Sequence, residues 1–124
     1  MNSKNTILVL GASTNVDRTS NLAVRRLIEK GFSVLALGKR GGVIEGIEIH
    51  KSPEELNNAK IDTITMYLNA NNQSAYYSWI LKLNPRRIIF NPGAENPDLE
   101  ALARNAGVET DNACTLVLLA TGTF

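Results

Sequence analysis

Cysteine, histidine and aromatic residues are scarce in this sequence, and each scarcity excludes a class of protein. The 124 residues include one cysteine (Cys114), one histidine (His50) and 6% aromatic residues. A single cysteine excludes a framework of internal disulfides and suits a reducing compartment, so we expect a cytoplasmic protein. No Cys/His cluster with metal-ligand spacing is present, so we predict no bound metal.

A large net charge and a long apolar run are also missing. The formal charge is +1 at pH 7, so no global field predicts binding to nucleic acid or to a membrane surface. No apolar run reaches the roughly 20 residues of a transmembrane helix. Residues 1–5 lack the apolar core of a signal peptide. We expect residues 1–124 to form a single domain of ordinary composition.

Apolar runs alternate with helical patterns along the chain. The runs predict five strands and a last short one, at residues 7–10, 32–37, 47–50, 61–68, 87–90 and 108–110. Amphipathic or capped segments between them predict helices. This alternation predicts an α/β fold, a Rossmann-like open parallel sheet of about five strands in the order 3-2-1-4-5, with helices on both faces. The apolar tail at 116–120 fits either a short helix on the sheet or an oligomer contact.

The first predicted strand leads into Gly11-Ala12-Ser13-Thr14-Asn15-Val16-Asp17-Arg18-Thr19-Ser20, and a helical pattern starts near Ser20. A strand, a turn of small residues and a helix present backbone N–H groups to a phosphate. The glycines of the G-x-G-x-x-G dinucleotide motif are absent, so this turn alone does not identify a cofactor. We expect Gly11 to pass close to the ligand, where a Cβ would intrude.

The second predicted strand ends in Gly38-Lys39-Arg40-Gly41-Gly42. An NAD site usually has an acidic residue here for the ribose hydroxyls. Two cations instead suit an extra phosphate on the ribose, as in NADP or coenzyme A (CoA), and Arg18 adds a further donor. A solvated basic loop is the alternative interpretation.

Three segments together resemble the small stand-alone CoA-binding proteins, which are similar to the N-terminal CoA-binding domain of the succinyl-CoA synthetase α subunit. They are residues 11–20 (Gly-Ala-Ser-x-Asn-x-x-Arg-x-Ser), the basic-Gly-Gly loop 39–42, and Pro92-Gly93-Ala94-Glu95-Asn96. Cys114 stands where many members carry a cysteine. In two places the chain departs from the family. Gly38-Lys39 replaces Asn-Pro, and Leu68-Asn69 replaces an Arg-Pro that offers a phosphate partner.

The resemblance implies how CoA would lie. Backbone N–H groups of Ser13, Thr14 and Asn15 would hold the pyrophosphate, and the basic pair would face the adenosine 3′-phosphate. The pantetheine arm would run past Leu68 and Asn69 toward Pro92 and Gly93. The predicted cofactor-binding residues are Gly11, Ala12, Ser13, Thr14, Asn15, Arg18, Gly38, Lys39, Arg40, Leu68, Asn69, Pro92 and Gly93.

We therefore expect a domain that binds CoA or an acyl-CoA and catalyses nothing by itself. The synthetase needs a phosphorylated histidine from a further domain. His50 is expected on an edge strand away from the loops, and Glu95 just before a helix suits dipole stabilisation more often than base catalysis. The alternatives are an NADP-binding domain and an interaction module with a vestigial nucleotide site. The expected partner is the small CoA ligand, and the sequence also allows a homo-oligomer or an unknown protein partner.

Overall fold

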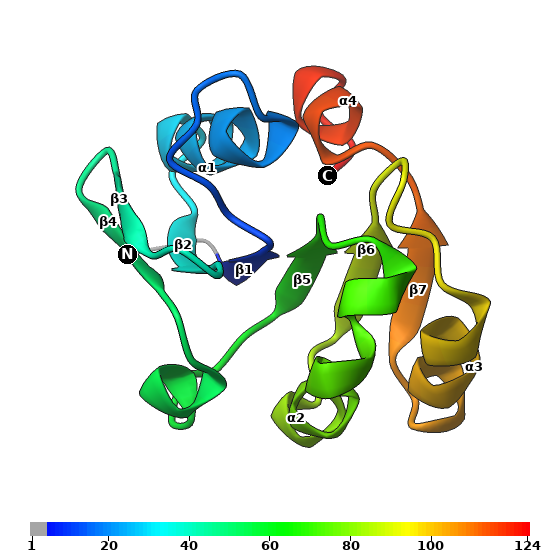
Figure 1. The fold of residues 1–124 in the computed structure, drawn as a ribbon. Coiled ribbons are helices and arrows are strands. Elements are labelled where there is room, and N and C mark those ends of the chain that lie inside the picture. The colour runs from blue at the N-terminus through cyan, green and yellow to red at the C-terminus, as the bar shows by residue number, and fades with distance from the viewer. Residues whose placement is uncertain (1–4) are drawn as a thin grey trace.

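A seven-stranded, mostly parallel sheet lies between two layers of helices (Figure 1). The structure is a computed structural model and describes residues 5–124. The expectation on the signal peptide concerns residues 1–5, and all of these except Asn5 lie outside the described residues. The elements in chain order are β1 (Thr6–Leu10), α1 (Thr19–Glu29), β2 (Ser33–Leu37), β3 (Gly42–Ile44), β4 (Ile47–His50), η1 (Pro53–Leu56), β5 (Thr63–Met66), η2 (Ala70–Asn72), η3 (Ser74–Tyr76), α2 (Tyr77–Leu83), β6 (Arg87–Phe90), α3 (Pro97–Asn105), β7 (Glu109–Asn112) and α4 (Thr115–Ala120).

The most apolar strand, β1, lies near the middle of the sheet. It pairs in parallel with β2 and β5, with Ile7 opposite both Val34 and Thr63. Residues 7–10 are at most 1% exposed because helices cover both faces of the sheet. A continuous run of β-branched residues and leucine is what such a doubly covered strand requires.

The strand order confirms the predicted core of the sheet and corrects its extent. The observed order is β3-β4-β2-β1-β5-β6-β7, so the five predicted strands lie in the predicted order. The count of about five is too low because both edges carry another strand. β7 is the predicted last short strand, whereas β3 begins in the glycine-rich segment 38–42, whose composition predicts a loop.

The missed strand β3 forms an antiparallel hairpin with β4. The two residues between them, Glu45 and Gly46, both have positive φ, 48° and 82°. Two successive residues with positive φ make the tight turn that matches strand twist. β4 is consequently an inner strand, and the expected edge position of His50 is wrong.

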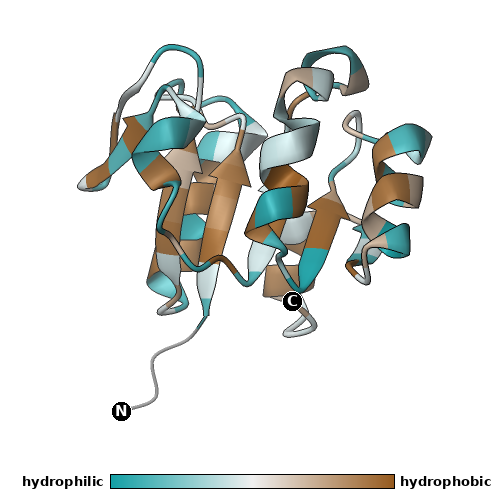
Figure 2. Ribbon diagram, turned by 90° about the horizontal axis from the view of Figure 1, so that it is seen from below, coloured by the Kyte–Doolittle hydropathy of each residue, from teal (hydrophilic) through white to brown (hydrophobic). Residues whose placement is uncertain are grey.

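Each face of the sheet has its own apolar core. α1 and α4 cover one face, where Val24, Leu27 and Leu119 are buried, and α2 and α3 cover the other with Ile80 and Leu99 (Figure 1). Figure 2 shows the hydrophobic strands in the middle, with hydrophilic residues on the surrounding helices and turns. The predicted placement of helices on both faces is thus confirmed.

The apolar tail forms the short helix α4, which is the first of its two predicted alternatives. Leu119 is 5% exposed and packs with Val24 and Leu27 of α1. Across residues 5–124, none of the helices has the length and apolar character that crossing a membrane requires.

Candidate functional site

The carboxyl ends of β1, β2 and β5 meet around one cleft of about 550 Å³. Backbone hydrogen bonds join these ends: the N–H groups of Gly11 and Ala12 both donate to the Leu37 carbonyl, and Tyr67 N–H donates to Leu10. All the predicted site residues except Asn69, Pro92 and Gly93 line this cleft. The full lining is Leu10, Gly11, Ala12, Ser13, Thr14, Asn15, Arg18, Leu37, Gly38, Lys39, Arg40, Leu68, Asn71, Asn72, Ser74, Ala75 and Tyr76.

The first loop builds its own turn before α1 begins. The Asn15 side chain accepts a hydrogen bond from Asp17 N–H at 2.9 Å, and Asn15 N–H donates to Ser13 Oγ at 3.1 Å. An asparagine that accepts from the backbone two residues later stabilises such a turn. Of the three N–H groups expected to hold a phosphate, that of Asn15 is therefore already engaged by Ser13.

A buried asparagine on α1 fixes the first loop, and sequence reasoning missed it. Asn21 is 2% exposed, and its side chain donates to the Ser13 carbonyl at 3.0 Å. Arg25 donates in turn to Asn21 Oδ1 at 2.8 Å, which holds the asparagine side chain in place. A polar residue on the buried face of a helix was the available signal, because buried polar groups need partners.

Glycines let the second loop lie directly against the first. A Cβ at Gly38 would overlap the Ala12 carbonyl oxygen, and one at Gly42 would overlap the Thr14 methyl group. Gly38 N–H donates to the His50 carbonyl at 2.9 Å, which ties this loop to β4. Lys39 and Arg40 therefore lie on a loop that packs against the first loop and is hydrogen-bonded to β4.

The structure shows that Gly11 also has a role within the protein itself. Its φ is +102°, and a Cβ there would lie 3.1 Å from the Leu68 backbone nitrogen and 3.1 Å from the Tyr67 carbonyl carbon. The glycine thus allows β1 to pass close to the end of β5, where a side chain would meet protein backbone. Gly11 also lines the cleft, and its expected closeness to the ligand stays a prediction.

The cleft is electropositive. Arg18, Lys39 and Arg40 are exposed and line it, and none of the three forms an ion pair within residues 5–124. The lining includes no Asp or Glu. Arg18 is also the N-cap of α1, whose first turn contains no acidic residue and which no side chain of the described residues caps. Positive side chains and an uncompensated helix N-terminus both favour an anion.

The far side of the cleft starts at the predicted residue Leu68 and extends further along the chain than predicted. Beyond Leu68, the lining continues through η2 and η3 to Tyr76. Asn69 caps η2 by accepting from Asn72 N–H at 3.1 Å, so its side chain shapes this wall although Asn69 does not line the cleft. The polar run 69–72 is the sequence signal for this wall, because it directly follows the predicted strand 61–68.

Pro92 and Gly93 lie outside the cleft lining and belong to the turn before α3. Both residues are exposed, and Gly93 N–H donates to Oε1 of Glu95 at 2.9 Å. Asn96 caps α3 by accepting from Leu99 N–H, and its amide donates to Gln73 and to Tyr77. In this structure the Pro-Gly-Ala-Glu-Asn segment therefore builds a turn and a helix start.

Three titratable groups that could do chemistry lie outside the lining. Glu95 supports the turn at Gly93, Cys114 is half-buried beside α4, and burial raises the pKa of Tyr67 to about 12. At neutral pH a phenol with that pKa stays protonated and is not a base. The cleft itself holds cations, amides and hydroxyls, which suits binding of a phosphate-containing ligand.

Comparison with known proteins identifies relatives over the whole chain. The model of one protein family, described as CoA binding domain, matches residues 5–120. None of the curated proteins searched matches the chain. A crystal structure of an uncharacterized protein is 38% identical, with a TM-score of 0.92 over 99% of this chain and 100% of that one.

Two further solved structures share the fold. A protein from Thermus thermophilus, described as cell-free ID.343, is 25% identical, with a TM-score of 0.86 over 98% of this chain and 91% of that one. A conserved hypothetical protein from Pyrococcus furiosus is 26% identical, with a TM-score of 0.77 over 91% of this chain and 97% of that one. The family match and the 38% identical structure both span nearly the full length. The chain therefore belongs to the CoA binding domain family.

Proposed function

We propose that this chain binds CoA or an acyl-CoA in the cleft at the carboxyl ends of β1, β2 and β5. The observation that carries the proposal is a set of three cations, Arg18, Lys39 and Arg40, that have no ion-pair partner among the described residues and surround a lining without carboxylates. CoA carries a pyrophosphate and a 3′-phosphate, and the family match supports this ligand over other polyphosphates.

Each part of the ligand has a matching part of the cleft. The N–H groups of Ser13 and Thr14 and the N-terminus of α1 suit the pyrophosphate. Lys39 and Arg40 suit the 3′-phosphate, because charge-assisted hydrogen bonds to phosphate are the strong ones. The pantetheine arm then passes Leu68 toward Tyr76, the direction in which the cleft extends, and this replaces the path toward Pro92 and Gly93.

Calorimetry with a panel of ligands tests the proposal. CoA should bind more tightly than 3′-dephospho-CoA by about 1–3 kcal/mol if the basic loop holds the 3′-phosphate. Equal affinities for the two ligands would contradict that role of the loop. NADP and NAD complete the panel, since tighter binding of NADP than of CoA would favour the alternative of an NADP-binding domain. No binding by any member would favour an interaction module.

We also propose that the chain binds its ligand without transforming it. Glu95, His50 and Cys114 all lie outside the lining of the cleft. Protein given CoA, succinate and ATP should release no phosphate. Phosphate release that disappears in Glu95→Gln would contradict this and identify Glu95 as a base.

A further inference from the structure

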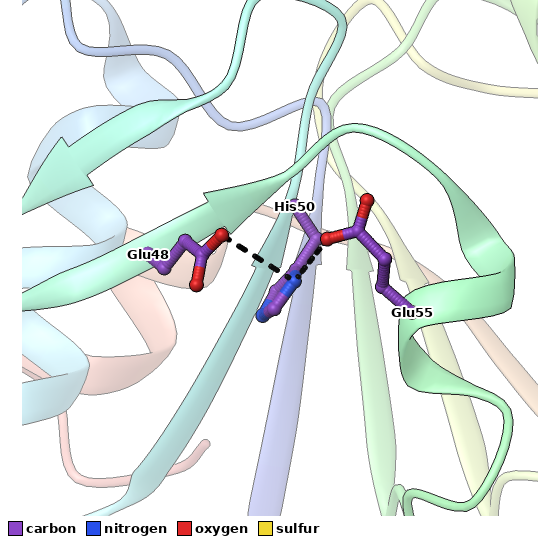
Figure 3. A group of neighbouring side chains, drawn as sticks. All are labelled: Glu48, His50 and Glu55. Atoms are coloured by element: carbon purple, nitrogen blue, oxygen red, sulfur yellow. Dashed lines mark hydrogen bonds and ion pairs between the residues drawn. The ribbon is translucent and has the colours of Figure 1, made fainter.

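One imidazole nitrogen and two carboxylates converge at a second place, outside the cleft. Nδ1 of His50 lies 2.7 Å from Oε1 of Glu55 and 4.0 Å from Oε2 of Glu48. All three ligand atoms lie within 4.8 Å of one another. Figure 3 shows both carboxylates directed at the same ring nitrogen. The cluster is not explained by the proposed ligand, because its residues do not line the cleft.

The fold places these side chains on well-anchored backbone. Glu48 and His50 are two residues apart on β4, so they point to the same face of the strand. β4 is hydrogen-bonded on both sides, to β2 and to β3. Glu55 comes from η1, whose start is set by Pro53. The sequence did not predict this cluster because the spacing 48, 50 and 55 matches no familiar ligand motif.

No basic side chain of the described residues besides His50 balances the two carboxylates of the cluster. The Nδ1 proton is donated to Glu55, and Glu48 at 4.0 Å is too far to share it. Among residues 5–124, no lysine or arginine pairs with Glu48 or Glu55. The two carboxylates face one nitrogen, and their nearest oxygens lie within 4.8 Å of each other. Two negative charges at that distance repel each other, and a cation between them would relieve the repulsion.

We propose that Glu48, His50 and Glu55 bind one divalent transition-metal ion, with Zn²⁺ the best match. An imidazole nitrogen selects zinc and its neighbours over Mg²⁺ and Ca²⁺, which prefer oxygen ligands alone. Metal–ligand bonds of about 2.0–2.2 Å place the ligand atoms of a tetrahedral site about 3.4 Å apart.

Small side-chain movements reach that geometry. The 2.7 Å contact between Nδ1 and Glu55 must widen, and the 4.0 Å gap between Nδ1 and Glu48 must close. Both carboxylates can move because the side chains of Glu55 and Glu48 are 45% and 67% exposed. The ion replaces the proton on Nδ1, and three protein ligands leave a fourth position for water.

Zinc titration of the full chain, prepared without a polyhistidine tag, tests this site. We expect calorimetry with ZnCl₂ to show one ion bound per chain. His50 is the only histidine, so the two ¹⁵N signals of its imidazole ring report on this site alone. Zinc should shift the Nδ1 signal strongly and the Nε2 signal weakly, and an Nε2-dominated shift would overturn the proposed geometry.

Single substitutions distinguish a built site from an isolated surface histidine. Glu48→Gln and Glu55→Gln keep side-chain size, and each should weaken zinc binding at least about tenfold. Glu45→Gln removes one charge from the same hairpin and should leave the affinity unchanged. Zinc affinity that stays at the wild-type value in both Glu48→Gln and Glu55→Gln would overturn the proposal, because His50 alone would then account for the binding.

Discussion

At the carboxyl edge of the sheet, the polar residues of one half line an open cleft, whereas those of the other half are buried and hydrogen-bonded within the protein. Around β1 and β2, loops 11–18 and 38–42 present cations and backbone N–H groups to an open cleft. Between β5 and β6, behind the cleft wall, Asn91, Gln73 and Asn96 are at most 5% exposed. Their side chains form hydrogen bonds to other buried groups of the protein.

The buried half is a closed network. Asn91 donates to Thr65 Oγ1 at 2.8 Å and to the Met66 carbonyl at 2.9 Å, and it accepts from Thr115 N–H at 2.8 Å. Gln73 donates to the carbonyls of Leu68 and Ala94, both at 2.8 Å. These groups have their partners inside the protein, whereas the cations of the other half form no ion pair with any residue from 5 to 124. A loop rich in Asn, Gly and Pro therefore indicates a ligand site only where its polar groups remain unpaired.

The largest effect should come from breaking the closed network. Asn91→Ala leaves the Met66 carbonyl and the Thr115 N–H without their side-chain partner in a buried place. It should lower the free energy of unfolding by about 3 kcal/mol, measured by urea denaturation.

The matched control for this change lies in the open half. Asn71 is exposed in the cleft wall, and Asn71→Ala should change stability by less than about 0.5 kcal/mol. A smaller loss for Asn91→Ala than for Asn71→Ala would contradict the division into a closed and an open half.

Gly38→Ala should have the next largest effect, because its Cβ would overlap the Ala12 carbonyl oxygen. We expect a loss of about 1–3 kcal/mol in stability, together with weaker CoA binding as the two loops separate. Denaturation and calorimetry on the same sample measure both.

Gly93→Ala is the control on the other half. Nothing lies within 4 Å of the added Cβ, but its φ is +93°, so it should cost about 1 kcal/mol of stability and leave CoA affinity unchanged. If Gly93→Ala weakens CoA binding more than Gly38→Ala does, the pantetheine arm lies over β6 after all.

Arg40→Ala should weaken CoA binding by about 1.5 kcal/mol, roughly tenfold, and barely affect 3′-dephospho-CoA. The residue has no ion-pair partner among the described residues, so stability should be unchanged. The salt dependence of CoA binding should also flatten, because exposed charges are screened over about 8 Å at physiological ionic strength. Equal losses for both ligands would assign Arg40 to the pyrophosphate or to loop structure.

The smallest effect concerns a basic residue that is paired, at the opposite edge of the sheet. Arg86 donates to both oxygens of Asp62, at 3.0 and 3.1 Å, and lowers the pKa of that carboxyl. Asp62→Asn should reduce stability at pH 7 by about 0.5 kcal/mol, since the arginine is half exposed.

The pH dependence of this pair follows from the lowered pKa. Its stabilisation is fully present above the pKa of an unfolded aspartate, about 3.9, and disappears as the pH falls through the lower folded-state value. The stabilities of wild type and Asp62→Asn should therefore converge in acid. A difference that persists unchanged at pH values where Asp62 is protonated in the folded protein would contradict the ion pair as its source.

The sequence by itself determined the alternation of strands and helices, the order of the inner strands, and the two loops that line the cleft. Periodicity and apolar runs act locally, and the right-handed crossover rule then leaves few arrangements of a parallel sheet. The basic residues at 39 and 40 could be read directly because charge near a strand end does not depend on distant contacts.

Only the tertiary structure decided what depends on partners far apart in the chain. That Gly11 faces the Tyr67 backbone, that Asn91 binds Thr65, and that His50 meets Glu55 are contacts made by folding. Whether a polar side chain is satisfied inside the protein or remains available to a ligand is set by these long-range contacts, and a linear pattern does not encode them.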